Sequence, residues 1–352
     1  MTDMKKMGIA SFTARGKEAA IRLGALFQKE YEILFYYKDG KESLKEWCGR
    51  CFSQAEALIF VGACGIAVRT IAPFLQDKTR DPAVLVMDEA GKYVISLVSG
   101  HIGGANRLAL RVSESLGAEP VITTATDVNG KFAVDVFARD NGLVIDSMKA
   151  AKEISAAVLR ENRVYLYCEG KIKGKFPEEL TLWEQRELPQ EKEGAVIWIS
   201  PFLPEKPKED FQGTVLHLIP KAVSVGIGCR RGKSREEIQQ TVLEAASLAG
   251  VMSGAFEQAA SVDLKKGEPG ILGFCQEWGL PYRTYSSEEL SEVTGEFSSS
   301  AFVKEITGTD NVCERAALAC AGSGGRLIQR KYAKNGVTAA LAVREWSVDF
   351  GK

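Results

Sequence analysis

The chain has 352 residues, a hydrophobic content of 45%, a charged content of 26% and a formal net charge of −1. This length predicts two or three domains, and the near-neutral charge gives no indication of a nucleic-acid partner. The first twenty residues lack the apolar core of a secretory signal, and no apolar run approaches the roughly 18 residues of a membrane span. Eight cysteines scattered over so long a chain are typical of reduced thiols, so we expect a cytoplasmic protein with no membrane partner.

Residues 1–140 alternate short apolar strands with amphipathic helices. Strands are predicted at 7–12, 32–37, 57–61, 83–87, 93–98 and 121–123, and helices at 16–28, 43–52, 66–74 and 105–116. This alternation indicates a mainly parallel sheet covered by helices. We therefore predict an α/β fold for this first domain.

Residues 141–220 show strand-like runs at 164–168, 195–200 and 215–219 with few helical signals, which predicts a small middle domain. From 221 to 352 a strand at 223–227 precedes a helix that starts with the capping box Ser234–Glu237. Helices at 269–278 and 311–321 follow, then a closing hairpin at 326–332 and 337–344. The predicted fold is thus two α/β domains with mainly parallel sheets, joined by a small strand-rich middle region.

Three polar or glycine-rich junctions follow predicted strand ends in the first domain, at 62–65, 99–106 and 123–127. The carboxyl ends of parallel strands line one edge of a sheet, where ligands bind, and the amides at helix starts favour anions. Any one junction alone is equally consistent with a tight turn, but three together favour a binding cleft for carboxylates or phosphates. The residues predicted to form this cleft are Gly62, Gly65, Arg69, Ser99, Gly100, Gly103, Gly104, Asn106, Thr123 and Thr124.

His101 is the main catalytic candidate. It is one of only two histidines and stands between glycines rather than on an apolar face. A side chain that titrates near neutrality is suited to general base catalysis, although a helix-capping or surface histidine is the alternative. Asp127, in the third junction, is the candidate to orient the histidine or to handle a second proton.

The third domain carries a second anion-binding candidate. Gly226, Gly228, Arg230 and Arg231 follow a strand and precede the capped helix, in a pattern close to a dinucleotide fingerprint. The last spacing is one residue too long, and no acidic residue stands where a ribose needs one, so the two arginines favour carboxylate recognition instead. The segment with Thr307 and Thr309 precedes another helix, where it either caps that helix or presents amides to an anion.

Cys48-Gly49-Arg50-Cys51 has the spacing of a thioredoxin active site. That chemistry needs the first cysteine at a helix start directly after a strand, whereas the residues before Cys48 are polar and predicted to be helical already. A zinc site would need two further ligands, and there is no second CxxC. Coincidence is favoured, and a thiol oxidoreductase remains one alternative.

Several of these motifs together resemble the CbiG family, the cobalt-precorrin-5A hydrolases of anaerobic cobalamin biosynthesis. The resemblance rests on 60–69, Lys78 with 81–84, Ser99–Asn106 and 123–127 in the first domain, and on 225–232 and 307–314 in the last. It covers nearly the whole chain in the family's domain order, and the string Ser-Gly-His-Ile-Gly-Gly-Ala-Asn is its most specific part.

The resemblance implies an enzyme that opens the ring A δ-lactone of a cobalt corrinoid and releases acetaldehyde. The substrate is then a macrocycle rimmed with carboxylates, which brings its own cobalt, so that neither a cofactor nor a protein metal site is expected. His101 would activate water, and amides of Gly103, Gly104 or the 62–65 turn would stabilise the oxyanion. A tetrapyrrole carrier without activity and a dinucleotide enzyme remain alternatives, and the sequence leaves open which domain holds the reacting atoms and whether the chain forms a homodimer.

Overall fold

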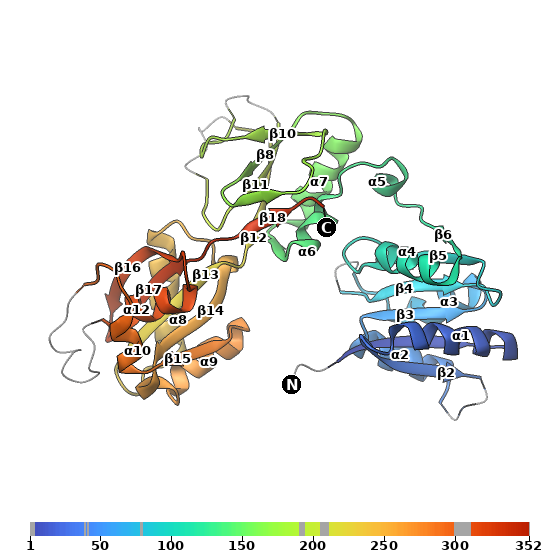
Figure 1. Ribbon diagram of the computed structural model, residues 1–352, viewed down its shortest axis with the longest axis horizontal. Helices are drawn as coiled ribbons and strands as arrows, with labels where there is room; N and C mark the ends of the chain where they lie inside the picture. The colour runs from blue at the N-terminus through green and yellow to red at the C-terminus, as the bar shows by residue number, and fades with distance from the viewer. Residues whose placement is uncertain are drawn as a thin grey trace. The chain divides into compact units, whose positions relative to one another are not determined.

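The computed structural model describes residues 4–38, 40, 42–77, 80–189, 194–204, 211–298 and 311–351. They form two compact units, Met1–Val136 and Phe137–Lys352, coloured blue to teal and green to red respectively (Figure 1). No helix within these described ranges is long and apolar enough to cross a membrane.

The first unit is built on a six-stranded sheet with the order β2-β1-β3-β4-β5-β6. β1 to β4 run parallel, β5 is antiparallel to β4, and β6 is parallel to β5. The strands are β1 (Lys5–Ser11), β2 (Tyr31–Tyr37), β3 (Ala57–Val61), β4 (Ala83–Met87), β5 (Tyr93–Val98) and β6 (Glu119–Val121).

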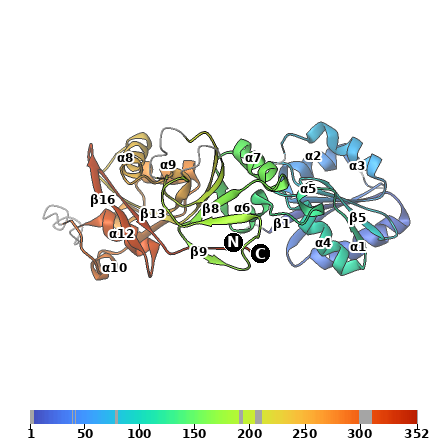
Figure 2. The same cartoon turned by 90° about the horizontal axis from the view of Figure 1, so that it is seen from above.

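Helices cover both faces of this sheet because each one presents an apolar stripe to it. Figure 2 shows α2 (Leu44–Gln54) and α3 (Cys64–Ile71) on one side and α1 (Ala14–Phe27) and α4 (Ala105–Leu116) on the other. The two buried clusters divide the helices in the same way, since one contains residues of α2 and α3 and the other residues of α1 and α4. The remaining short elements are the 3-10 helix η1 (Ala72–Phe74), α5 (Ala125–Val128) and α6 (Val134–Asp140), the last of which crosses into the second unit.

The reversal between β4 and β5 divides the glycine-rich junctions between the two edges of the sheet. Val98, at the end of β5, pairs with Val84 near the start of β4, whereas Val61, at the end of β3, pairs with Met87. The 99–106 loop therefore lies where β3 and β4 begin, and the 62–65 turn lies where they end, a strand length of about 17 Å away. The expectation that all three junctions share one edge is wrong, because β5 returns as a hairpin strand.

The second unit begins with a five-stranded sheet, β10-β8-β11-β12-β7, which is parallel except for β7. Its strands are β7 (Leu143–Ile145), β8 (Val164–Cys168), β10 (Leu180–Trp183), β11 (Ala195–Ile199) and β12 (Thr214–Pro220). A helix that the sequence analysis did not predict, α7 (Met148–Leu159), packs on this sheet. Its buried residues Ala150, Ala151, Ile154 and Val158 have helical spacing, but the small alanines make the apolar stripe weak.

The last part of the second unit is an α/β layer with the strand order β15-β14-β13-β17-β16. The helices α8 (Arg235–Leu248) and α9 (Pro269–Trp278) cover one face, and α10 (Ser287–Glu292) and α12 (Val312–Ala321) cover the other. Its strands are β13 (Val223–Cys229), β14 (Phe256–Val262), β15 (Tyr282–Tyr285), β16 (Arg326–Lys334) and β17 (Val337–Val343), with 3-10 turns η2 (Ser253–Ala255) and η3 (Asp263–Lys265).

The end of the chain returns to the start of the second unit. β18 (Ser347–Asp349) pairs in parallel with β9 (Lys171–Lys173). The Asp349 amide donates to Asn141 Oδ1 at 2.7 Å, and the ring of Phe350 stacks on Phe137 with centroids 4.4 Å apart. These contacts tie the middle region to the carboxyl-terminal layer within one unit.

Candidate functional site

The loop between β5 and α4 is closed by its own backbone hydrogen bonds. The Gly104 amide donates to the His101 carbonyl and the Asn106 amide to the Gly100 carbonyl, both at 3.0 Å. Ser99 (φ 59°) and Gly104 (φ 83°) adopt the left-handed conformation that lets the chain turn sharply into α4. The Gly104 amide is thus already used inside the loop, and it is not a free donor for an oxyanion.

The other two glycines of this loop allow close packing. A Cβ on Gly100 would lie 2.7 Å from Asn106 Oδ1, and one on Gly103 would overlap Ser99. Their lack of a side chain therefore keeps the loop tight beneath His101. Both residues, predicted as substrate contacts, have a demonstrable packing role here.

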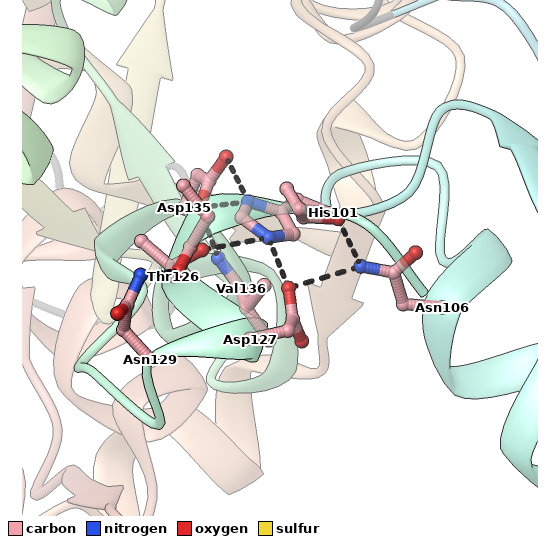
Figure 3. A network of polar contacts seen from close by, with 9 residues as sticks. His101, Asn106, Thr126, Asp127, Asn129, Asp135 and Val136 are labelled. Carbon is pink, nitrogen blue, oxygen red and sulfur yellow. Dashed lines mark hydrogen bonds and ion pairs between the residues drawn. The ribbon is translucent and has the colours of Figure 1, made fainter. Parts of the chain in front are cut away.

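The loop places the His101 ring between two carboxylates (Figure 3). Nε2 lies 2.7 Å from Asp127 Oδ2 and Nδ1 lies 3.2 Å from Asp135. The hydroxyl of Thr126 is 3.0 Å from Nε2. The Asp135 side chain is 10% exposed and that of Asp127 is 36% exposed, so Asp135 holds the ring from the protein interior and Asp127 lies on its solvent side.

These carboxylates raise the pKa of His101 above its ordinary value. The hydrogen bond to Asp135 is the largest cause, burial opposes it, and the hydrogen bond to Asp127 adds to it. With both ring nitrogens facing a carboxylate, the resting histidine is stabilised as the imidazolium. It must lose a proton before it can serve as a general base.

Asn106, on the first turn of α4, extends this network. Its Nδ2 donates to Thr124 Oγ1 at 2.9 Å and to Asp127 Oδ2 at 3.0 Å. Its buried Oδ1 and the buried hydroxyl oxygen of Ser99 have no hydrogen-bond partner within the described part of the chain. Buried polar atoms without a protein partner are typical of positions that solvent or a ligand completes.

The structure brings together only part of the predicted cleft. His101, Asp127, Asn106 and Thr124 form one network, and Thr123 beside them is exposed. The second group, Gly62, Gly65 and Arg69, lies at the opposite edge of the sheet, where Arg69 Nη1 donates to the Gly65 carbonyl at 3.3 Å. That turn cannot supply oxyanion donors to His101.

Sequence reasoning missed Asp135, the residue on Nδ1. It lies in the first turn of α6, 34 residues after the histidine and outside every motif considered. An acidic residue in the first turn of a helix is ordinary on its own, because it favours the helix dipole. Only the fold places it beneath the ring.

The carboxyl-terminal layer contains a separate pocket of about 1280 Å³. Its walls come from the end of β13 and the loop after it, from the end of β14, from the β16–β17 hairpin, and from the starts of α9 and α12, where helix amides favour anions. Four basic residues line it, namely Arg230, Arg231, Lys265 and Lys331. Burial alone would raise the pKa of Glu268, but hydrogen bonds from Lys265 and the Gly232 amide outweigh it and keep this acid ionised. The four basic side chains outnumber this one lining carboxylate, so the pocket is basic, as expected from the two arginines.

Gly228, Arg230 and Arg231 lie in this pocket, but Gly226 does not. Gly226 is in the middle of β13, where a Cβ would overlap the Cys313 carbonyl of α12. Its prediction as a substrate contact is wrong, because its role is to let α12 approach the sheet. The other two predicted residues, Thr307 and Thr309, lie outside the described residues.

The CxxC pair is not placed for thiol chemistry. Cys48 and Cys51 both lie inside α2 and are fully buried. Burial raises the pKa of Cys48 to about 12 and that of Cys51 to about 11. Neither thiol is ionised near neutrality, so this structure contradicts the thiol oxidoreductase alternative.

The sequence matches known proteins over nearly its whole length. Models described as cobalamin synthesis G N-terminal, cobalamin biosynthesis central region and cobalamin synthesis G C-terminus match residues 46–127, 132–220 and 223–342. A cobalt-precorrin-5A hydrolase from Salmonella typhimurium is 34% identical, over 97% of this chain and 99% of its own length. One from Priestia megaterium is 30% identical, over 97% and 96%.

A solved structure of a cobalamin biosynthesis protein G homolog from Sulfolobus solfataricus covers 97% of both chains, with 23% identity and a TM-score of 0.42. The assignment rests on the sequence matches. Because they extend over nearly the whole chain and the central loop with His101 falls within the amino-terminal model, the chain belongs to the CbiG (cobalamin synthesis G) family.

Proposed function

We propose that this chain is a cobalt-precorrin-5A hydrolase, the name carried by its relatives of 34% and 30% identity. In this proposal it opens the ring A δ-lactone of a cobalt corrinoid, releases acetaldehyde and yields cobalt-precorrin-5B. Cobalt enters as part of the substrate. The observation that carries the proposal is the His101 ring, held between Asp127 and Asp135.

The two carboxylates have different roles in the proposed reaction. Asp135 is buried and orients the ring through Nδ1, which leaves Nε2 directed toward Thr126 and Asp127. Asp127 is the more exposed carboxylate, and the proposal has substrate and water approach from its side. The histidine is therefore the general base, Asp135 its orienting partner, and Asp127 the group that handles the second proton.

The hydrolytic step begins when water attacks the lactone carbonyl and Nε2 of His101 takes the water proton. Collapse of the tetrahedral intermediate breaks the ring C–O bond, and the imidazolium returns its proton to the departing alkoxide. The products of this step are a carboxylic acid and a secondary alcohol. Asp127 then accepts the alcohol proton while the adjacent C–C bond breaks, so that acetaldehyde leaves and the electron pair remains on the conjugated macrocycle.

The tetrahedral oxyanion needs donors on the same side as Nε2. The Gly104 amide is bonded to the His101 carbonyl, and the 62–65 turn is at the other edge of the sheet. We assign this role to the Gly103 amide, because the Thr126 hydroxyl is already bonded to Nε2 at 3.0 Å.

The pocket of the carboxyl-terminal layer is proposed to bind the carboxylates of the corrinoid rim. Its volume of about 1280 Å³ exceeds that of pockets for drug-sized ligands, as a macrocycle requires. Arginine forks match carboxylates in geometry, and the helix starts add partial positive charge.

The test is to incubate the protein with cobalt-precorrin-5A, trap acetaldehyde as its hydrazone and determine the corrinoid mass. His101→Ala is expected to lower turnover about 10²- to 10⁴-fold, the range of general base catalysis. Glu114→Gln, which changes an exposed acid on α4, serves as the control. Full acetaldehyde release by His101→Ala would refute the role of the histidine. Tight corrinoid binding with no mass change in the unaltered protein would support the carrier alternative.

A further inference from the structure

Asn106 is a buried amide on the first turn of α4 to which the proposed reaction assigns no role. It is 6% exposed, and a buried asparagine is expected to be hydrogen-bonded. Its backbone amide donates to the Gly100 carbonyl at 3.0 Å, and its Oδ1 lies 2.7 Å from the position that a Cβ on Gly100 would take. The loop before α4 therefore fixes this side chain, because any side chain at position 100 would displace it.

The side chain of Asn106 is bonded to the next helix rather than to its own. Short polar side chains near a helix start usually accept from amides of the same helix. Asn106 Nδ2 instead donates to Thr124 Oγ1 at 2.9 Å and to Asp127 Oδ2 at 3.0 Å. Thr124 is the N-cap of α5, where its hydroxyl makes no capping bond. One contact of Asn106 thus links two helix starts, and the other reaches the catalytic network.

The chemistry of the partners fixes the orientation of the amide. An ionised carboxylate only accepts hydrogen bonds, so the NH₂ group must face Asp127. Both of its N–H groups are then used, which leaves no side-chain donor for a substrate. The remaining Oδ1 is buried, and as an acceptor it cannot pair with the lactone carbonyl or the rim carboxylates of the proposed substrate. Asn106 is therefore poorly suited to bind the corrinoid directly.

Asn106 and His101 meet on the same oxygen of Asp127 (Figure 3). Asp127 Oδ2 lies 2.7 Å from His101 Nε2 and 3.0 Å from Asn106 Nδ2. The Asp127 side chain is 36% exposed, and its helix α5 has four residues, so burial does little to hold the carboxylate. Holding an exposed side chain in one rotamer costs conformational entropy. The buried amide supplies a fixed donor that offsets this cost.

We propose that Asn106 is a positioning residue, which holds Asp127 Oδ2 against His101 Nε2 and does not contact the substrate. In the proposed reaction Asp127 accepts the alcohol proton, a step that requires its carboxylate within hydrogen-bond reach of the reacting groups. Asn106 thus does for this carboxylate what Asp135 does for the ring. The inference rests on the proposed function, and it reassigns a residue that the sequence analysis expected in the binding cleft.

A double-mutant cycle on acetaldehyde release tests whether Asn106 acts through Asp127. Asn106→Ala should lower kcat roughly 10- to 150-fold, the effect of losing a hydrogen bond to a charged group, with KM changed less than about twofold. The double variant should lose no more activity than Asp127→Ala alone. A KM that rises at unchanged kcat would identify a substrate contact, and losses that multiply would identify independent roles. Either result overturns the proposal.

Imidazole NMR tests the same contact without substrate. The chain has two histidines, so His101→Gln assigns the His101 signals. Below the raised pKa of His101 both ring nitrogens carry a proton. Asn106→Ala should speed exchange of the Nε2–H proton with water, because Asp127 is released, while the Nδ1–H proton that faces Asp135 keeps its shift. An unchanged Nε2–H signal, or equal loss of both signals, overturns the proposal.

The NMR result decides the positioning role even if the unaltered protein releases no acetaldehyde, so the two proposals can fail separately. Ser113→Ala is the matched control, because Ser113 is a buried polar residue roughly two turns along the same helix. Its kinetics and His101 signals should match the wild type. Asn106→Ser, too short to reach Asp127, is the second variant should Asn106→Ala fail to fold. Wild-type kcat or an unchanged Nε2–H signal in this variant would equally overturn the proposal.

Discussion

Replacing Asp135 by asparagine tests the orienting carboxylate while it leaves the catalytic ring of His101 in place. Asparagine keeps the shape of the side chain, but it removes the negative charge that faces His101 Nδ1 at 3.2 Å. That contact is the largest cause of the raised histidine pKa. The variant should therefore lose its proton at lower pH, and the acid limb of kcat/KM should move to lower pH.

The size of the activity loss follows from the bond that is removed. A hydrogen bond to a charged group contributes about 1.5 to 3 kcal/mol. If that stabilisation acts in the transition state, where the histidine becomes an imidazolium, turnover falls roughly 10- to 150-fold, since 1.36 kcal/mol corresponds to a factor of ten. The loss is smaller than that predicted for His101→Ala because the base itself remains.

The assay is acetaldehyde release from cobalt-precorrin-5A between pH 5 and pH 9, with kcat and KM determined at each pH. Glu114→Gln, an exposed charge change in the same unit, should reproduce the wild-type profile. An Asp135→Asn acid limb that stays in place or moves to higher pH would refute the assignment of Asp135 as the partner that holds the imidazolium. Unchanged kcat would refute its orienting role.

Three further outcomes are expected. Arg230→Met with Arg231→Met should raise KM for the corrinoid about tenfold with kcat preserved, since a lost charged hydrogen bond has that effect on binding. The control Lys266→Met, outside the pocket, should leave KM unchanged. A fall in kcat alone would contradict this prediction. Cys48 should not react with an aromatic disulfide in the native protein near pH 8, because its pKa is about 12, and rapid labelling would disprove its burial. Because the folded pKa of His101 is raised, its ion pairs stabilise the fold below the unfolded value of about 6.5 and cease to do so as pH rises through the folded pKa. Urea unfolding should show this decline in the wild type and not in His101→Gln.

The regular elements of this protein are predictable because their apolar periodicity is local. Leu23 and Ala19 on α1, and the five buried residues of β3, are visible in the sequence as helical and strand patterns. The capping box of Ser234 and Glu237 marks the start of α8 and is present in the structure. Each of these signals depends on residues fewer than eight positions apart, where chain connectivity alone fixes the geometry.

The candidate site is only partly predictable, because its partners come together through tertiary structure. His101 and Asp127 were identified from loops that follow strands, and their 2.7 Å contact confirms that they meet. Asp135 was missed because nothing within its own segment distinguishes it from an ordinary acid at a helix start.

The direction of β5 explains why sequence reasoning placed three junctions at one edge of the sheet, whereas the structure divides them between two edges. Had β5 run parallel to β4, the loops after β3 and β5 would share an edge, and Gly62, Arg69 and His101 would line one cleft. The short turn at 88–92 is too brief for a parallel crossover, which requires a dozen or more residues, so the hairpin was already implied by the loop length. Its consequence is that the sheet has two polar edges: one carries the His101 network, and the other carries the 62–65 turn with Arg69.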